Sequence, residues 1–377
     1  MNRILSIVLL LGASISLHAQ VDSLATDTLV EEEDFSMYDN VDFADPGVKR
    51  FCTSKVLDLS PAKFITIGYD YQARHQLNNG AYKASILNTT INYGEQSTAI
   101  KSSGGPRFNA NIPVISRNNI IIQLGANYLQ NDYALVNPVD RDPTQNPILY
   151  PPMQQTIEQS TLRSMGLSAT VFKPLNERQF LILQASQDWN GDYNFGDFQD
   201  MHMPTFSAAG IFGWKPSDRK MIGFGATRNY RAGELNYIPV FLLNWTAPSR
   251  KWGVEILAPA RGHYRRTFSS RSLLLIGYEL EGNSYVLSKP SVFQESESTF
   301  VLRRSELRFR AVYERSIKSF IWLSWQVGYR YNYSYNVDEL ADGQDFFRGF
   351  FGEQPFAIEN DLTNSFYTMF TINLVSP

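Results

Sequence analysis

The sequence predicts an all-β protein: a closed antiparallel transmembrane β-barrel of about 14 strands, within a range of roughly 12–16. Three observations support this fold class. Apolar and polar residues alternate almost without interruption between Lys318 and Asn336, no apolar run beyond the N-terminus is long enough for a membrane-spanning helix, and short connections alternate with long ones. A sheet that crosses lipid has to close on itself, because an open edge would leave backbone groups unpaired.

The alternating segment has one apolar face and one polar face. Its apolar face holds Ile321, Leu323, Trp325, Val327, Tyr329 and Tyr331, and its polar face holds Ser324, Gln326, Gly328, Arg330, Asn332 and Ser334. Successive side chains of a strand point to opposite faces. The segment is longer than an ordinary strand of about 5–6 residues. It is long enough to cross a bilayer, which takes roughly 9–11 residues with lipid on one face and a polar lumen on the other.

Similar alternation recurs along the chain and divides it into strands. The predicted strands cover residues 63–75, 105–115, 119–130, 161–173, 178–189, 205–215, 219–231, 236–247, 251–259, 262–268, 270–284, 299–314, 318–335 and 365–375. The pair 251–259 and 262–268 is the least regular, and the barrel would have about 12 strands without it. Residues 81–103 fit either an outer loop or a further hairpin, which would raise the number to about 16. Residues 238–246 are apolar on both faces, which predicts that a loop or plug packs against the inner wall there.

The connections between these strands alternate in length, as they do in outer-membrane barrels. Short connections lie at 116–118, 174–177, 216–218, 248–250 and 315–317, and long ones at 131–160, 190–203, 286–298 and 336–364. Short turns of such barrels face the periplasm and long loops face outward, so the bacterial outer membrane is the predicted location. A secreted β-sandwich is the alternative fold, but its strands would be shorter and its loops less asymmetric.

The N-terminal region predicts export. Residues 1–19 combine Arg3, an apolar run and Ala19 at the end, which is the pattern of a cleaved signal peptide. A membrane anchor would need roughly 18 or more apolar residues, and this run is shorter. Residues 20–61 are then expected to form an acidic periplasmic arm or plug, since nine acidic residues and no lysine or arginine lie between Gln20 and Val48. The outer-membrane barrel is expected over residues 62–377.

Charged residues recur on the inward face of three neighbouring predicted strands. They are Arg304, Glu306, Arg308 and Arg310 on one strand, Glu279 and Glu281 on the preceding strand, and Arg330 on the following strand. Antiparallel neighbours bring facing side chains within reach of each other. A ring of arginine and glutamate inside a barrel can set ion selectivity or bind an anionic solute. The alternative is a structural charge network that braces the lumen, with each charge satisfied by its neighbours.

Signals for catalysis are weak. Beyond the signal peptide the histidines are His75, His202 and His263, which lack the spacing of metal ligands. The single cysteine, Cys52, excludes a disulfide within the chain. No catalytic residue, metal or cofactor is therefore assigned. A Ser–His pair assembled in space is still open, because catalytic triads are defined by geometry rather than by order. An outer-membrane lipid-modifying enzyme is thus an alternative function.

The expected function is a narrow or gated channel or transporter for small solutes. Barrels of roughly 16–18 strands leave an aqueous channel, and a smaller barrel leaves a tighter lumen. The expected partners are outer-membrane lipid, the outer-membrane assembly machinery during biogenesis, and a small solute. Nucleic acid is not expected, since the basic pair Arg303-Arg304 is divided between the two faces of its strand. A further alternative is a surface interaction scaffold that presents the long loops 131–160 and 336–364.

Several short motifs carry a resemblance to a known family. They are Ile238-Pro239 leading into Lys251-Trp252-Gly253-Val254-Glu255, then Ala258-Pro259 and Tyr264, and the stretch from Gly277 to Tyr285, which reads Gly-Tyr-Glu-Leu-Glu-Gly-Asn-Ser-Tyr. With these motifs the chain resembles an uncharacterised family of Gram-negative outer-membrane β-barrel proteins, a domain-of-unknown-function family, over residues 64–375. The resemblance implies a barrel and an outer-membrane location. It implies no catalytic residues, because the family has none assigned.

Overall fold

The computed structural model describes residues 51–86, 89–136, 161–193, 204–229, 236–287, 299–340 and 356–375. The strands in these ranges are β1 (Lys63–Gln72), β2 (His75–Asn79), β3 (Tyr82–Ile86), β4 (Thr89–Tyr93), β5 (Gln96–Arg117), β6 (Ile120–Leu135), β7 (Leu162–Pro174), β8 (Gln179–Gly191), β9 (Thr205–Ser217), β10 (Lys220–Asn229), β11 (Asn236–Thr246), β12 (Trp252–Ala258), β13 (Arg261–Ser269), β14 (Ser272–Leu287), β15 (Thr299–Lys318), β16 (Ile321–Leu340), β17 (Asn360–Leu362) and β18 (Ser365–Val375). Across the same ranges, no helix has the length and apolar character that a membrane crossing requires.

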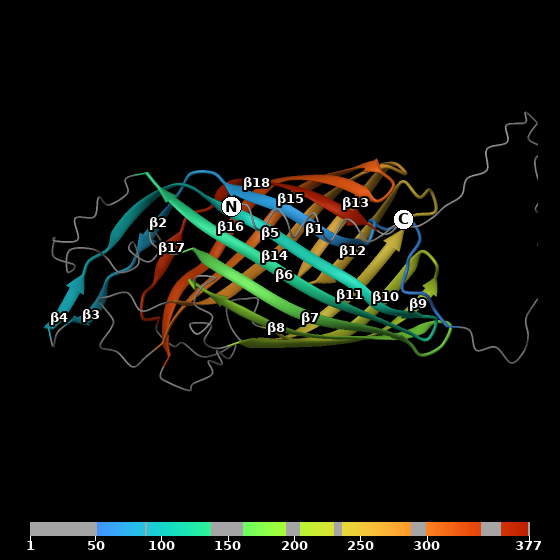
Figure 1. The fold of residues 1–377 in the computed structure, drawn as a ribbon, viewed down its shortest axis with the longest axis horizontal. Helices are drawn as coiled ribbons and strands as arrows, with labels where there is room; N and C mark the ends of the chain where they lie inside the picture. Colours follow the sequence, from blue (N-terminus) through green and yellow to red (C-terminus); the bar gives the residue numbers. More distant parts are fainter. Residues whose placement is uncertain are drawn as a thin grey trace, which may run out of the picture. The chain divides into compact units, whose positions relative to one another are not determined.

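Fourteen of the described strands form one closed antiparallel ring, in the order β1, β18, β16, β15, β14, β13, β12, β11, β10, β9, β8, β7, β6 and β5. The ring closes because β1 pairs with β18 on one side and with β5 on the other. Figure 1 shows these strands side by side around the wall, all with a similar tilt. The predicted closed barrel of 14 strands is therefore confirmed. Both strands of its least regular pair, β12 and β13, belong to the ring.

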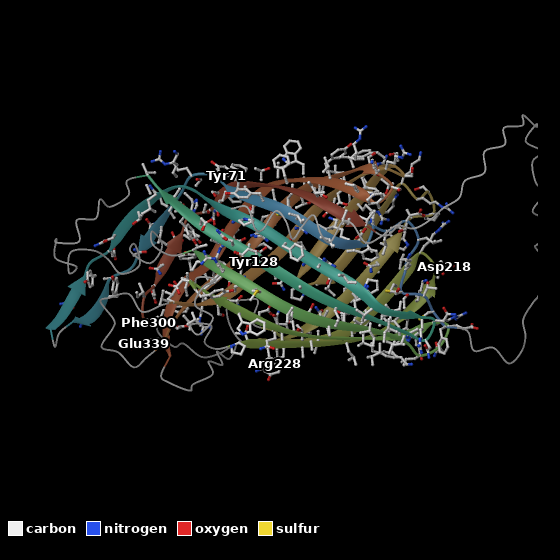
Figure 2. All side chains as sticks on the ribbon, in the orientation of Figure 1. Tyr71, Tyr128, Asp218, Arg228, Phe300 and Glu339 are labelled. Carbon is white, nitrogen blue, oxygen red and sulfur yellow. The ribbon has the colours of Figure 1, made fainter. Side chains whose placement is uncertain are left out.

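The two faces of the wall have the chemistry that the alternation predicts. On β18, Phe366 and Phe370 point outward, and 71% of the Phe366 surface is exposed. On the neighbouring β16, Gln326 and Arg330 point inward, and Arg330 is 0% exposed. Figure 2 shows side chains projecting from the outer face of the ribbon over much of its length. A soluble protein shows the opposite distribution, with large apolar residues inside and arginine outside.

At the end that carries the long connections, part of the sheet continues beyond the ring. The first residues of β5 pair with β2, β2 pairs with β17, and β3 and β4 form a separate hairpin. The described residues between 81 and 103 thus form β3, β4 and the start of β5, and they add no strand to the ring. The number of ring strands is fourteen for this reason.

A glycine lies where β5 exchanges its partner β2 for β1. Gly104 has φ +149°, and a Cβ atom at this position would lie 2.0 Å from the backbone oxygen of Asp70 on β1. A side chain is excluded by both the backbone conformation and this close approach. Gly104 therefore allows β5 to lie close against β1 at the seam where the ring closes.

Residues 51–61 pack against the inner wall at the end that carries the short turns. Cys52 and Val56 lie in one apolar cluster with Phe180, Met221 and Leu242, which point inward from β8, β10 and β11. The backbone N–H of Cys52 donates to a turn carbonyl at 3.0 Å, as does that of Leu57 at 2.8 Å. The contacts confirm that the apolar inner face of residues 238–246 receives another segment. The expected signal peptide and residues 20–50 of the expected arm lie outside the described residues.

The opposite end of the ring is narrowed by a contact between strands that are not ring neighbours. Gly191 of β8 forms a parallel bridge with Val286 of β14, and the Asp192 N–H donates to the Val286 carbonyl at 3.2 Å. An inward apolar cluster fills this level and includes Leu162, Tyr285, Leu302, Tyr335 and Leu362. Packed side chains therefore constrict the lumen at both ends.

Candidate functional site

The middle of the lumen holds a cluster of charged side chains. Its core comes from β15, in which charged residues occupy alternate positions. Arg304, Glu306, Arg308 and Arg310 occupy every second position of this strand, so all four point to the same face. Arg304, Glu306 and Arg308 are buried. The residue between the last two charges, Phe309, points outward and is exposed. The same alternation that makes the outer wall apolar thus gathers charge inside.

The ion pairs of this cluster run along β15 or diagonally between strands, and none of them joins directly facing residues. Glu281 faces Glu306 across β14 and β15, and Arg308 faces Arg330 across β15 and β16, so these two facing pairs have like charges. Arg308 also faces Glu279, but Glu279 pairs with Arg310 instead. Arg308 instead binds Glu281 with two nitrogens, Nη1 at 2.8 Å and Nη2 at 2.9 Å. Diagonal neighbours on adjacent strands are within reach of long side chains. Positive and negative groups therefore lie next to each other both along β15 and between neighbouring strands.

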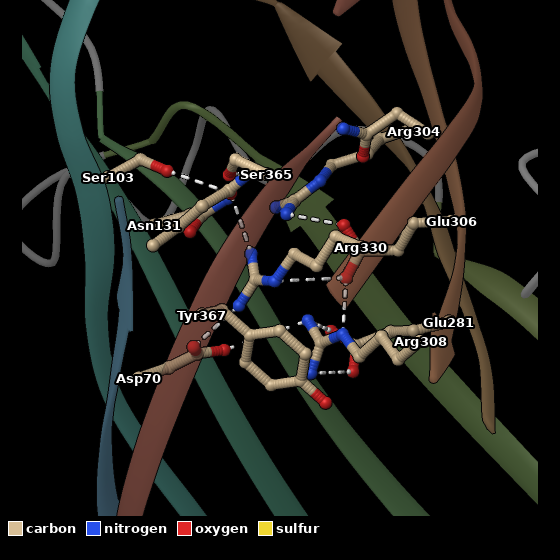
Figure 3. Close-up of polar contacts among 12 residues, drawn as sticks. Asp70, Ser103, Asn131, Glu281, Arg304, Glu306, Arg308, Arg330, Ser365 and Tyr367 are labelled. Carbon is tan, nitrogen blue, oxygen red and sulfur yellow. Dashed lines mark hydrogen bonds and ion pairs between the residues drawn. The ribbon is translucent and has the colours of Figure 1, made fainter. Parts of the chain in front are cut away.

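Glu306 and Arg308 are the centre of the cluster. Glu306 accepts hydrogen bonds from Arg308 Nε and from Arg304 Nη2, the latter at 2.9 Å. Arg330 Nε lies 3.8 Å from the same carboxylate. Arg310 pairs with Glu279 through its Nη1. Five of the seven residues expected from the sequence, Glu281, Arg304, Glu306, Arg308 and Arg330, therefore lie in one network (Figure 3). The Arg310–Glu279 pair is joined to it through Gln326, which accepts from Arg310 Nη1 at 3.4 Å and donates to Tyr367.

Two charged residues that join this network were not among the expected ones. Asp70 of β1 pairs with Arg330, and Arg107 of β5 lies 2.8 Å from both Asp70 and Glu281. Each lies on the inward face of its strand, which the alternation of β1 and β5 indicates. Their contact with the residues of β14 and β16 depends on how the wall folds back across the lumen. The spacing of residues along the sequence does not predict this contact.

An aromatic ring completes the network. Tyr367 of β18 lies beneath two guanidinium groups, with Arg330 Cζ 4.7 Å and Arg308 Cζ 5.4 Å from its ring centroid (Figure 3). Its hydroxyl accepts a hydrogen bond from Gln326 Nε2 at 2.5 Å. A cation over the face of a tyrosine ring is attracted by the ring quadrupole. Tyr367 therefore helps to hold both arginines in place.

We call this network the lumen charge belt. Its members are Asp70, Arg107, Glu279, Glu281, Arg304, Glu306, Arg308, Arg310 and Arg330. Five guanidinium groups meet four carboxylates, so the belt carries an excess of one positive charge. Buried charges are costly unless they are paired and hydrogen-bonded. The dense pairing satisfies this requirement, and the excess positive charge favours anions in the adjacent lumen.

The inner wall across from the belt is lined mainly by uncharged polar groups, with Asp188 of β8 as a carboxylate on the same face, and solvent reaches part of it. The uncharged side chains are amides and hydroxyls, namely Asn109, Asn111, Gln123, Asn127, Ser168, Thr170, Gln184 and Ser186. Among these, Asn109, Asn111 and Gln184 are exposed although they point into the barrel. Charged side chains thus fill the part of the lumen next to the belt. Solvent-accessible space remains next to the opposite wall, which small polar side chains line.

The two histidines within the described ranges lie on separate strands. His263 of β13 accepts a hydrogen bond at Nε2 from Arg310 Nε at 3.0 Å. His75 of β2 is buried, its Nδ1 lies 2.8 Å from the Ala73 carbonyl, and its Nε2 has no hydrogen-bond partner. His202 lies outside the described residues. No group of three metal-ligating side chains occurs among the residues that the structure describes.

A protein-family model matches residues 152–374, and its description is "Domain of unknown function (DUF6268)". This match covers more than half of the chain and includes most of the ring. No curated protein matches the chain. The family comparison thus assigns no activity and no site residue.

Solved structures of low similarity include three outer-membrane proteins. An outer membrane channel from Pseudomonas putida F1 has 11% identity, a TM-score of 0.33, and coverage of 84% of this chain and 97% of its own. The toluene transporter TodX of P. putida has 8% identity and a TM-score of 0.32, with coverage of 86% and 93%. The outer membrane protease OmpT of Escherichia coli has 9% identity and a TM-score of 0.27, with coverage of 84% and 99%. These likenesses transfer no residue role to this chain.

Proposed function

Because the chain belongs to the DUF6268 family, whose function is unknown, we propose its function from its own geometry: a narrow, gated outer-membrane channel for small solutes. The observation that carries this proposal is the position of the lumen charge belt. Partly buried arginine and glutamate side chains bridge the lumen from β14 to β5, beside amide groups that solvent reaches.

The outer surface supports a membrane location. Outward aromatic residues gather near the short turns, where Trp245 packs against Trp252 with ring centroids 4.8 Å apart, and Trp252 packs against Tyr264 at 6.0 Å. Tryptophan and tyrosine favour the headgroup level of a bilayer because they join an apolar ring to a polar tip. The partner of this surface is outer-membrane lipid.

The belt provides the selectivity of the proposed channel. A solute that passes along the amide wall meets fixed charges with a net excess of one positive group. Rings of charged side chains in a pore select ions by sign, and arginine favours anions. The expected cargo is therefore small, and it is neutral or anionic.

The segment 51–61 provides the gate at the short-turn end. Lys215 Nζ donates to the Lys55 carbonyl at 2.7 Å, and Thr246 Oγ1 donates to the Leu57 carbonyl at 2.8 Å. Ser60 Oγ donates to Glu255 Oε1 at 2.8 Å. These polar contacts and the apolar cluster at Cys52 hold the segment in the lumen opening. Passage requires this segment to shift, so the described conformation corresponds to a closed or low-conductance state.

Conductance measurements on the purified protein in planar bilayers test the proposal. Arg107→Ala removes one positive charge and the bridge across the lumen, so conductance should rise and anion preference should fall. Glu281→Gln removes one negative charge, so anion preference should rise. Arg219→Ala, at a short turn outside the belt, is the matched control and should behave like the unmodified protein. A correctly inserted protein that stays silent in all four forms would contradict the channel.

A further inference from the structure

A cavity of about 640 Å³ lies at the loop end, away from the lumen charge belt. The end of β2, the start of β5, the end of β16 and residues 356–361 line it. Figure 1 places this region where β2 and β17 run together. Ligand pockets commonly have volumes of about 300–1,000 Å³, so the cavity can hold a small ligand.

Three amide side chains form a row across one side of this cavity. Gln96 of β5 faces Asn79 of β2, and Asn79 faces Asn360 of β17. Facing residues on antiparallel strands lie on the same side of the sheet. The sheet therefore presents three neighbouring amide groups, and all three residues line the cavity.

Two of these amides have no hydrogen-bond partner. Asn79 is only 3% exposed, yet neither its Nδ2 nor its Oδ1 is bonded, and the same holds for both amide atoms of Asn360. Neighbouring amides are paired: Asn78 Oδ1 accepts from Ser97 Oγ, and Asn336 Oδ1 accepts from the Asn360 N–H, both at 2.8 Å. Buried polar groups without partners are rare in folded proteins. The unpaired atoms of Asn79 and Asn360 are covered from water, so a ligand that enters between these amides would meet donors and acceptors that are otherwise unpaired.

The other lining groups define the chemistry of the ligand. Glu95, Glu359 and Asp361 add carboxylate acceptors, and no lysine or arginine is among the described residues that line the cavity. The described part of the lining is therefore negative and disfavours phosphate, sulfate and carboxylate groups. Phe356 contributes one flat apolar surface.

We propose that this cavity binds a neutral carbohydrate. A sugar hydroxyl both donates and accepts a hydrogen bond, and an asparagine amide offers both functions on neighbouring atoms. Carboxylates accept from further hydroxyls, and the C–H face of a sugar ring packs on an aromatic ring such as Phe356.

Calorimetric titration of the full-length protein tests the proposal in tetraethylene glycol monooctyl ether, a detergent without a sugar headgroup. The neutral probes are maltotriose, cellotriose and N-acetylated chitotriose, and trigalacturonate and trialanine are the anionic and peptide probes. At least one neutral trisaccharide should bind, and Asn79→Ala should weaken it about tenfold or more, the equivalent of one buried polar contact. Asn92→Ala, an exposed asparagine on β4 outside the cavity, is the matched control and should leave the affinity unchanged.

Several outcomes would overturn the proposal. These are the absence of binding by every neutral trisaccharide, equal affinity in the Asn79→Ala protein, and binding of trigalacturonate or trialanine in place of the sugars. The first of these outcomes would mean that water alone satisfies the amides. Asn360→Ala replaces Asn79→Ala if that variant loses the heat-modifiable migration of a folded barrel. Because titration needs no ion flow, the result is independent of whether the barrel conducts.

Discussion

Arg107 of β5 and Glu281 of β14 form a two-point ion pair across the lumen, with Arg107 Nη2 2.8 Å and Nη1 3.0 Å from the two carboxylate oxygens. The shorter path around the ring between these strands passes through β1, β18, β16 and β15. The pair thus joins two parts of the wall that have no backbone hydrogen bonds to each other. It makes the lumen charge belt a brace as well as a barrier.

The brace predicts an energetic coupling between the two residues. In a double-mutant cycle with Arg107→Ala and Glu281→Gln, the coupling in the free energy of unfolding should reach about 0.5–3 kcal/mol, as for other contacting pairs. Urea unfolding in lipid vesicles, followed by tryptophan fluorescence, measures it. Arg107→Ala combined with Glu314→Gln is the control, since Glu314 pairs with Lys63 and does not contact Arg107. Additive effects in the first cycle would show that the ion pair does not brace the wall.

Arg308 should be the most costly single residue of the belt to remove. It contacts Glu281 and Glu306, lies 3.6 Å from Asp70 and stacks above Tyr367. Arg308→Ala leaves Glu281 and Glu306 with one cation fewer in a buried site, which costs about 3–5 kcal/mol of unfolding free energy. Arg308→Lys should restore only part of this, because an ammonium group cannot bind a carboxylate with two nitrogens. Urea midpoints of the two variants test this order, and equal midpoints would contradict it.

The wall of the barrel could be predicted because the alternation of apolar and polar residues is visible within each strand separately. The alternation that separates Phe309 from Arg308 is local, and it assigns every residue of β15 to one face without knowledge of its neighbours. The same holds for the inward position of Glu281 and Arg330. The alternation places β13 to within one residue at each end, but β5, β14 and β16 extend beyond their predicted ends, to Gln96, Leu287 and Leu340.

The contacts across the lumen could not be predicted in this way. Asp70 and Arg107 are inward by parity, but parity does not state which opposite strand they reach. The carbohydrate cavity shows the same limit, since Asn79 and Asn360 lie far apart in the sequence and become neighbours only when β17 adds to β2. Glu281 and Glu306 face each other as like charges, so a rule based on facing pairs would have assigned the wrong partners.

The close packing at the seam of the ring predicts that alanine substitution destabilises the protein at Gly104 but not at Gly94. A Cβ at Gly104 would lie 2.0 Å from the Asp70 carbonyl oxygen at a φ of +149°, whereas a Cβ at Gly94 would meet nothing within 4 Å. Gly104→Ala should therefore move β5 away from β1 and lower the free energy of unfolding by about 1–3 kcal/mol or more, the usual cost of a strained backbone. Gly94→Ala should leave it unchanged. Urea unfolding compares the two variants, and a Gly104→Ala protein as stable as Gly94→Ala would show that β5 has room to adjust at the seam.

The buried position of Cys52 predicts that its thiol reacts slowly with maleimide. Burial raises the pKa of the Cys52 thiol above its ordinary value, although the positive charge of nearby Lys215 opposes the rise. Since the thiolate is the reactive form, a raised pKa leaves less of it at neutral pH, and the buried side chain also limits access. Maleimide labelling at pH 7 should therefore be much slower in the folded protein than in urea, and it should accelerate as the pH rises.

A neighbouring position separates the effect of burial from that of the segment as a whole. Thr53 is exposed, whereas Cys52 packs against the inner wall. In a Cys52→Ala background, Thr53→Cys should label rapidly under the same conditions if residues 51–61 occupy the lumen opening as described. Equal rates at the two positions would mean that the segment leaves the wall in solution, and the barrel would then lack the proposed gate. If channel opening and the labelling rate of Cys52 increase together in the folded protein, the release of this segment is the gating step.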